Sequence, residues 1–362
     1  MEGAGDLAAL AIPFAAGAAA GFLLPASAGL FLSGWMPLLL FVPMAFLLAG
    51  SLSGRWTVPV FAVLFFLLGF FCQCSCALFP PAPGGWIPAQ RTCAALKRTI
   101  AGIPFPHPRS SGIVQALMTG DRSGLSRETT AAFRSSGASH ILALSGLHLG
   151  LIYLMIRKLT FILGNTPAAR KGRCALILAA TGFYTLMTGA GPSVVRAFLY
   201  ICISEGAALC PGRKKEPARI LLTALTVQLA LRPSVIGSVG FQLSYLAMLG
   251  ITVLFPRLQA WYPEPRTRLD RADPMRKIWS AAALTISCQA FTAPLAWVRF
   301  HTFPKYFLLT NLLSLPLSGA VMTVSAATVA LSAGGLCPAA LVRLDDALIE
   351  SLMFVLETVS SL

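Results

Sequence analysis

Long apolar segments separated by short polar ones run along the whole chain. A helix needs about 20 residues to cross a bilayer, and several runs reach this length while others fall short of it. The pattern predicts an all-α, polytopic membrane protein with about eleven transmembrane helices, some short or broken, plus amphipathic helices on the membrane surface. The runs cover residues 7–24, 35–50, 58–79, 139–156, 174–190, 194–210, 219–232, 238–256, 278–298, 306–335 (interrupted at Pro316) and 341–361.

Composition and charge support this class and predict an orientation. The 362 residues are 56% hydrophobic and only 11% charged, whereas soluble domains carry about 25% charged residues. Most of the net charge of +15 fits loops held on the cytoplasmic side. Basic residues gather in loops 157–173, 211–219 and 257–277. If all three loops are cytoplasmic, an even number of membrane passes must separate them, and two apolar runs do so in each case. Counting passes from these loops predicts a cytoplasmic N-terminus, an extracytoplasmic C-terminus and an extracytoplasmic segment 80–137.

This segment divides the chain into N-terminal membrane helices (1–79), an extracytoplasmic linker (80–137) and a transmembrane core (138–362). Within the linker, Ser110–Thr119 and a helix capped by Ser126 are predicted to lie along the membrane surface. The linker carries seven basic residues against two acids, which favours either a solvated surface or an outer mouth that attracts a polyanion. The candidate outer-mouth residues are Asp121, Arg122, Arg127 and Arg134.

Polar residues interrupt the apolar run that follows, in the sequence HILALSGLHLG (140–150). Ionisable groups at membrane depth are costly and usually face protein or water. His140 and His148 are eight residues apart, nearly on one helix face, and Ser145 is close enough to His148 to touch it. Gly146 weakens the helix beside them.

Further polar residues lie inside later runs. Each of these residues alone is explained by a hydrogen bond that its side chain forms with a neighbouring helix. Together, the residues predict a polar path through the bundle. The candidate path residues are His140, Ser145, Gly146, His148, Arg196, Gln242, Ser244 and Asn311.

No metal or cofactor motif accompanies this path. Cys72, Cys74 and Cys76 lack the spacing of a zinc site, although a bond from Cys93 to them stays open. There is no phosphate-binding loop of the G-x-x-x-x-G-K-[ST] type. The sequence therefore predicts no cofactor, no metal and no enzymatic activity.

Two alternatives remain open. Ser145 and His148 could act as nucleophile and base of an intramembrane serine hydrolase, but no acid lies nearby in the sequence. Broken helices at Ser145–Gly146 and at Pro316 would suit a secondary transporter of a small anion, but no internal repeat is visible.

Four motifs in the same order resemble the ComEC competence-protein family over roughly residues 105–335. They are ALMTGDRSGLSRETTAAFRSSG with GASHILALSGLHLGLI, then GPSVVRAFLY, PSVIGSVGFQLSYLAMLGI and FPKYFLLTNLLSLPLSG. The resemblance implies a competence-type channel core in the bacterial inner membrane that admits single-stranded DNA during natural transformation. It also implies a cytoplasmic helicase or ATPase and an outer DNA-binding competence protein as partners, with homo-oligomerisation left open.

The chain departs from many members of that family. It lacks room for their OB-like domain before the core, and no HxHxDH-like cluster marks the metallo-β-lactamase-like domain that many carry at the end. We therefore expect a channel core without nuclease activity, whether as a fragment, a split gene product or a short family member.

Overall fold

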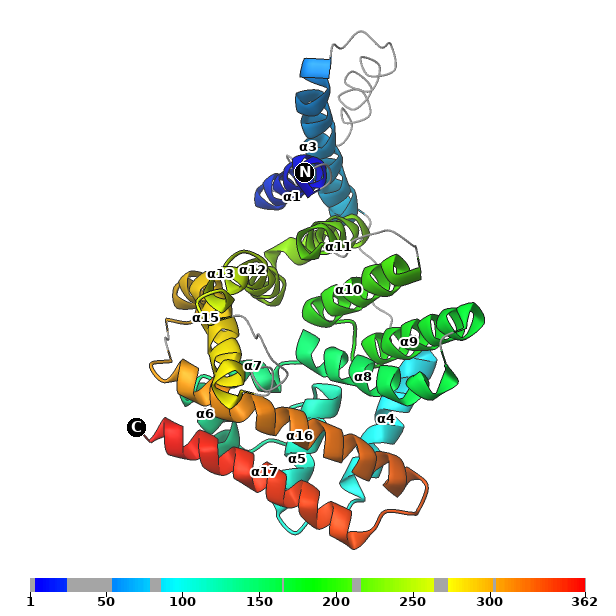
Figure 1. Cartoon of the computed structure of the whole chain (residues 1–362), viewed down its shortest axis with the longest axis vertical. Coiled ribbons are helices and arrows are strands. Elements are labelled where there is room, and N and C mark those ends of the chain that lie inside the picture. Colours follow the sequence, from blue (N-terminus) through cyan, green and yellow to red (C-terminus); the bar gives the residue numbers. More distant parts are fainter. Residues whose placement is uncertain are drawn as a thin grey trace. The chain divides into compact units, whose positions relative to one another are not determined.

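Every regular element that the structure describes is a helix (Figure 1). The computed structural model describes residues 4–24, 54–78, 86–164, 166–209, 216–263, 273–301 and 304–361. The chain divides into two compact units, residues 1–84 with 199–249 and residues 85–198 with 250–362. The prediction of an all-α chain is confirmed for the described residues.

The first unit is built on a close helix pair, α1 (Ala4–Leu23) and α3 (Gly54–Leu78). A Cβ atom at Gly17 would overlap the carbonyl oxygen of Phe66, and one at Gly69 would overlap that of Phe14. Small residues allow such backbone contact between membrane helices. α11 (Pro217–Leu231) and the 3₁₀ helix η2 (Pro233–Gly237) pack on this pair. The unit also contains its shares of α10 (Pro192–Leu209) and α12 (Val239–Val253).

We expect Gly17→Ala to lower the unfolding free energy in detergent by about 1–3 kcal/mol, because the added methyl group overpacks the α1–α3 contact. The matched control is Gly206→Ala on α10, where the new methyl group meets open space. It should be neutral or slightly stabilising, because alanine favours a helix over glycine. Equal loss in both variants would show that the close contact is not what stabilises the pair.

The second unit has its core where α5 (Pro108–Thr119) and α6 (Arg127–Ser135) meet α16 (Phe307–Ala333) and α17 (Ala339–Ser360). Figure 1 shows α16 and α17 side by side, as their contacts also require. The other elements are α4 (Ile87–Ala101), α7 (Ser139–Leu142), α8 (Gly146–Leu159), the 3₁₀ helix η1 (Thr160–Leu163), α9 (Pro167–Met187), α13 (Phe255–Gln259) and α15 (Pro274–Phe300).

The two short helices of the predicted linker are present. Ser126 caps α6, since its Oγ accepts a hydrogen bond from the N–H of Thr129 at 3.0 Å. α5 ends at Gly120, whose φ of 78° suits the left-handed cap of a helix. Ile113 and Leu117 of α5 are fully covered by protein, within the core shared with α16 and α17. The apolar face of α5 therefore packs on other helices.

Among the described residues, four helices are long and apolar enough to cross a membrane, on α3, α10, α15 and α16. The eleven-span count is not confirmed, and the predicted run 35–50 lies outside the described residues. The run 139–156 breaks between α7 and α8, at the weak point indicated by Ser145–Gly146. The expected interruption at Pro316 is wrong, because α16 continues through this residue. α17 is not a candidate span, because it carries five charged residues.

Candidate functional site

The break predicted at Ser145–Gly146 is the centre of the candidate site. α7 ends at Leu142, Ala143 is extended, and α8 begins at Gly146. Ser145 is the N-cap of α8, and its Oγ accepts a hydrogen bond from the N–H of Leu147 at 3.2 Å. Glycine at the first position and a serine cap before it are local reasons for the chain to leave one helix and begin another here.

His148 closes this cap from the other side. Its Nδ1 accepts the N–H of Ser145 at 3.2 Å and lies 3.1 Å from the Ser145 Oγ. This reproduces the capping box, with histidine in the place where glutamate or glutamine is usual. Because Nδ1 is an acceptor, the neutral ring carries its hydrogen on Nε2. His148 is buried, so its ring is held in one orientation.

Arg196 of α10 reaches the start of α8. A Cβ atom at Gly146 would lie 3.0 Å from Nη2 of Arg196 and 3.3 Å from the Cβ of Ala197. The missing side chain at Gly146 therefore leaves room for the guanidinium beside the N-terminus of α8. Four predicted path residues, Ser145, Gly146, His148 and Arg196, are brought together by the structure.

The turn before α6 supports the break. Nε of Arg122 donates to the carbonyl oxygen of Leu142, the last residue of α7, at 3.3 Å. Any side chain at Gly120 would overlap Leu144 inside the break. Arg122 was predicted as an outer-mouth residue, and the structure gives it a positioning contact with the backbone at the break.

The other predicted outer-mouth residues differ in environment. Asp121 accepts hydrogen bonds from Lys97 at 2.6 Å, from Gln115 at 3.1 Å and from the N–H of Ser123 at 3.0 Å. The hydrogen bond from Lys97, followed by those from Ser123, keeps the pKa of the Asp121 carboxyl far below its ordinary value. Asp121 is therefore an anion, and its hydrogen bonds stabilise the turn. Arg127 and Arg134 are exposed on α6.

The remaining path residues lie on other elements. His140 lies on α7 with an exposed side chain, and its Nδ1 is 3.2 Å from the carbonyl oxygen of Gly137. The break separates it from His148, so the expectation that both share one helix face is wrong. Gln242 donates to the carbonyl oxygen of Ile236 at 2.8 Å, within the first unit, which also contains Ser244.

Asn311 is on α16 in the second unit. Its Oδ1 is buried and has no hydrogen-bond partner among the described residues. Buried polar atoms nearly always have a partner, protein or water. The atom is therefore a place where water or a ligand would be favoured.

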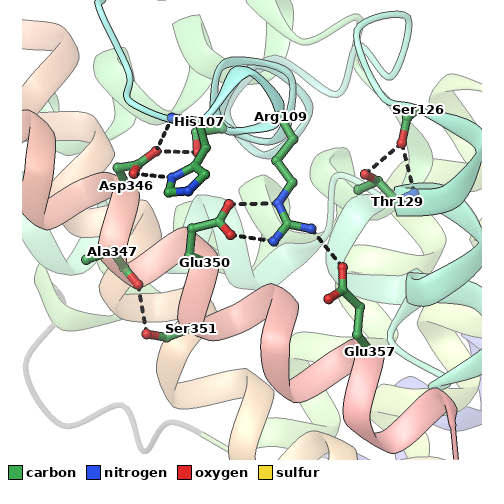
Figure 2. A network of polar contacts seen from close by, with 10 residues as sticks. His107, Arg109, Ser126, Thr129, Asp346, Ala347, Glu350, Ser351 and Glu357 are labelled. Atoms are coloured by element: carbon green, nitrogen blue, oxygen red, sulfur yellow. Dashed lines mark hydrogen bonds and ion pairs between the residues drawn. The ribbon is translucent and has the colours of Figure 1, made fainter.

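Sequence reasoning missed a polar network between α5 and α17, drawn in Figure 2. Arg109 donates through Nε to Glu350 at 2.7 Å, through Nη2 to the same carboxylate, and through Nη1 to Glu357 at 2.7 Å. The carboxylate of Asp346 accepts from Nδ1 of His107 at 2.7 Å and from Oγ of Ser110 at 2.6 Å. The spacing of the three acids, four and then seven residues apart, places them on one face of α17 and was the available signal.

These partners change the acidity of the two cations. Hydrogen bonding to Asp346 raises the pKa of His107 above its ordinary value. Hydrogen bonding to Glu350, and then to Glu357, raises the pKa of Arg109. The network therefore holds its cations charged and fastens α5 to α17.

Neither catalysis nor metal binding gains support from these contacts. The contact between Ser145 and His148 is explained by the helix cap. Among the residues with described positions, no group of three or more histidine, cysteine, aspartate or glutamate side chains is arranged to hold a metal ion. Cys93 and the cysteines at 72, 74 and 76 are free thiols in the structure.

Comparison with known proteins places these residues in a family. ComE operon protein 3 of Bacillus subtilis (strain 168) is 30% identical over 214 residues, which cover 58% of this chain and 25% of that protein. Uncharacterized protein YcaI of Escherichia coli (strain K12) is 24% identical over 229 residues, covering 62% of this chain and 29% of that protein. The chain thus spans between a quarter and a third of the length of these relatives. No solved structure matches it significantly.

A family model described as "Competence protein" matches residues 117–362, which is more than half of the chain. The match includes the turn at Asp121, the break at Ser145–Gly146 and Arg196. The resemblance found in the four sequence motifs is confirmed, and the chain belongs to the Competence protein family.

Proposed function

We propose that this chain is the membrane core of an inner-membrane channel through which single-stranded DNA enters during natural transformation. The observation that carries the proposal is the guanidinium of Arg196 beside the N-terminus of α8, at a helix break closed by Ser145 and His148. The family and the relative named for the ComE operon support a role in competence.

Physical chemistry requires such a site in any DNA conduit. A bilayer core of about 30 Å would hold about nine phosphates of an extended strand, and one charge at mid-membrane already costs about 2.5–3.5 kcal/mol. Phosphates therefore need a polar, hydrated path. The N-terminus of α8 presents the positive end of its helix dipole to anions, and Arg196 adds a guanidinium that can bind phosphate through two hydrogen bonds.

The proposed setting follows from the resemblance and from loop charge. The N-terminus is cytoplasmic and the C-terminus extracytoplasmic in the bacterial inner membrane. A cytoplasmic helicase or ATPase pulls the strand, because the chain has no nucleotide-binding loop of its own, and an outer DNA-binding protein delivers it. Arg127 and Arg134, exposed on α6, attract the strand electrostatically.

Transport of a small anion is the second candidate, because the broken helix at α8 would serve it equally well. The matching interruption at Pro316 is not seen, since α16 is continuous there. This favours the DNA conduit.

Proteoliposomes that contain the purified chain test the proposal. We expect a fluorescent single-stranded oligonucleotide added outside to become protected from external nuclease, with a Gly146→Val variant much less active because the new side chain meets Arg196. Empty liposomes give the background. Protection no greater than this background, together with uptake of labelled phosphate or sulfate, would replace the conduit by the transporter.

A further inference from the structure

A shallow groove lies between the loop that follows α4 and the turn that joins α16 to α17. It consists of two adjoining hollows, which share Pro104, Ser332 and Cys337 in their walls. Their lining contains two charged side chains, Arg98 and Arg343, and no acid. The groove is therefore positively charged.

These two arginines differ from the cations around them. Lys97 is paired with Asp121, and Arg109 is paired with two glutamates. In the part of the chain with described positions, neither Arg98 nor Arg343 forms an ion pair. Both arginines are exposed, so their guanidinium groups are accessible to an anion from outside the chain.

The position of the groove indicates which anion. α16 is a candidate membrane span of 27 residues, about 40 Å long, so its end reaches the head-group level of a bilayer with a core of about 30 Å. The groove lies at this end. Leu336 in the turn is 75% exposed, as expected for a side chain that contacts lipid. The phosphates present at this depth are those of phospholipids.

We propose that this groove binds the phosphate group of an anionic phospholipid, held by Arg98 and Arg343. Arginine binds phosphate oxygens through paired hydrogen bonds, and basic pockets beside membrane helices bind acidic head groups. Gly102 and Gly335 in the lining leave space for the head group, and Ile103 and Val342 give it an apolar floor. The site is separate from the break at Ser145 and does not depend on DNA transport.

Cys337 in the groove provides the measurement. The rate of maleimide labelling of Cys337 is measured by peptide mass spectrometry on the purified full chain in detergent. We expect short-chain phosphatidylglycerol to slow this labelling and short-chain phosphatidylcholine to leave it unchanged. Labelling of Cys93, which does not line the groove, is the internal control. Arg98→Gln and Arg343→Gln should each weaken the protection about fivefold.

Two further variants separate binding from folding. Arg98→Lys with Arg343→Lys keeps the charge and should retain most of the protection, whereas Arg91→Gln, on the same helix as Arg98 but outside the groove, should change nothing. Equal protection by phosphatidylcholine, or equal weakening by Arg91→Gln, would overturn the proposal. Protection by inorganic phosphate or by an oligonucleotide at the same concentration as the lipid would also overturn it, since the groove would then bind a soluble anion.

Discussion

His148→Ala is expected to abolish DNA entry while binding of DNA at the cell surface is unchanged. The substitution removes the acceptor of the Ser145 N–H, and a backbone group left unpaired in a membrane costs several kcal/mol. The start of α8 would shift relative to Arg196, and the site for phosphate would be lost. Transformation frequency, measured beside the amount of labelled DNA retained on cells, checks this result.

A second substitution separates the two roles of this histidine. Glutamine is a usual residue at this position of a capping box, so His148→Gln should restore the cap without the imidazole ring. Recovery of DNA entry would assign His148 a positioning role, and continued loss would give the ring itself a role in the path. Arg196→Ala should also abolish entry, and wild-type transformation by both alanine variants would remove these residues from the path.

Asp346→Ala is expected to give the largest loss of stability, about 3 kcal/mol, because it removes a buried carboxylate that joins α17 to α5 and leaves a buried hydroxyl without its acceptor. Asp346 is 4% exposed, and its loss leaves the buried hydroxyl of Ser110 without its acceptor. His107 is exposed, so solvent screens its share of the contact. Chemical unfolding in detergent, followed by circular dichroism, measures the change.

Ser351→Ala is the matched control on the same helix. Ser351 is exposed, and its hydroxyl contacts only the carbonyl oxygen of Ala347 within α17 (Figure 2). The substitution should change the unfolding free energy by less than about 0.5 kcal/mol. An equal loss in both variants would mean that α17 is stabilised by its own helix and that the network with α5 adds little.

The features that the sequence predicted correctly are local. The cap at Ser126, the turn at Gly120 and the break at Ser145–Gly146 each depend on a few neighbouring residues whose preferences agree. The contact between Ser145 and His148 followed from their spacing. The family signature identified the same stretch, which is why the centre of the site could be found without coordinates.

The features that were missed connect distant parts of the chain. Arg109 and Glu350 are 241 residues apart, so no local pattern pairs them, and the segment 341–361 was interpreted only as an apolar run. The side of the membrane on which each loop lies was predicted by counting membrane passes between basic loops. Such a count cannot detect that the loop after α4 and the turn after α16 line one groove. The reach of Arg196 to Gly146 likewise depends on how α8 and α10 pack.

The partnership of α5 with α17 has a consequence for how the protein is made. A ribosome completes α5 long before it reaches α17, so Ile113 and Leu117 emerge without the residues Ile349 and Leu352 of their common core. Until the last helix is synthesised, this apolar surface needs a temporary cover, from lipid or from the insertion machinery. Maturation of the second unit is therefore a late event, completed after translation of its final helix.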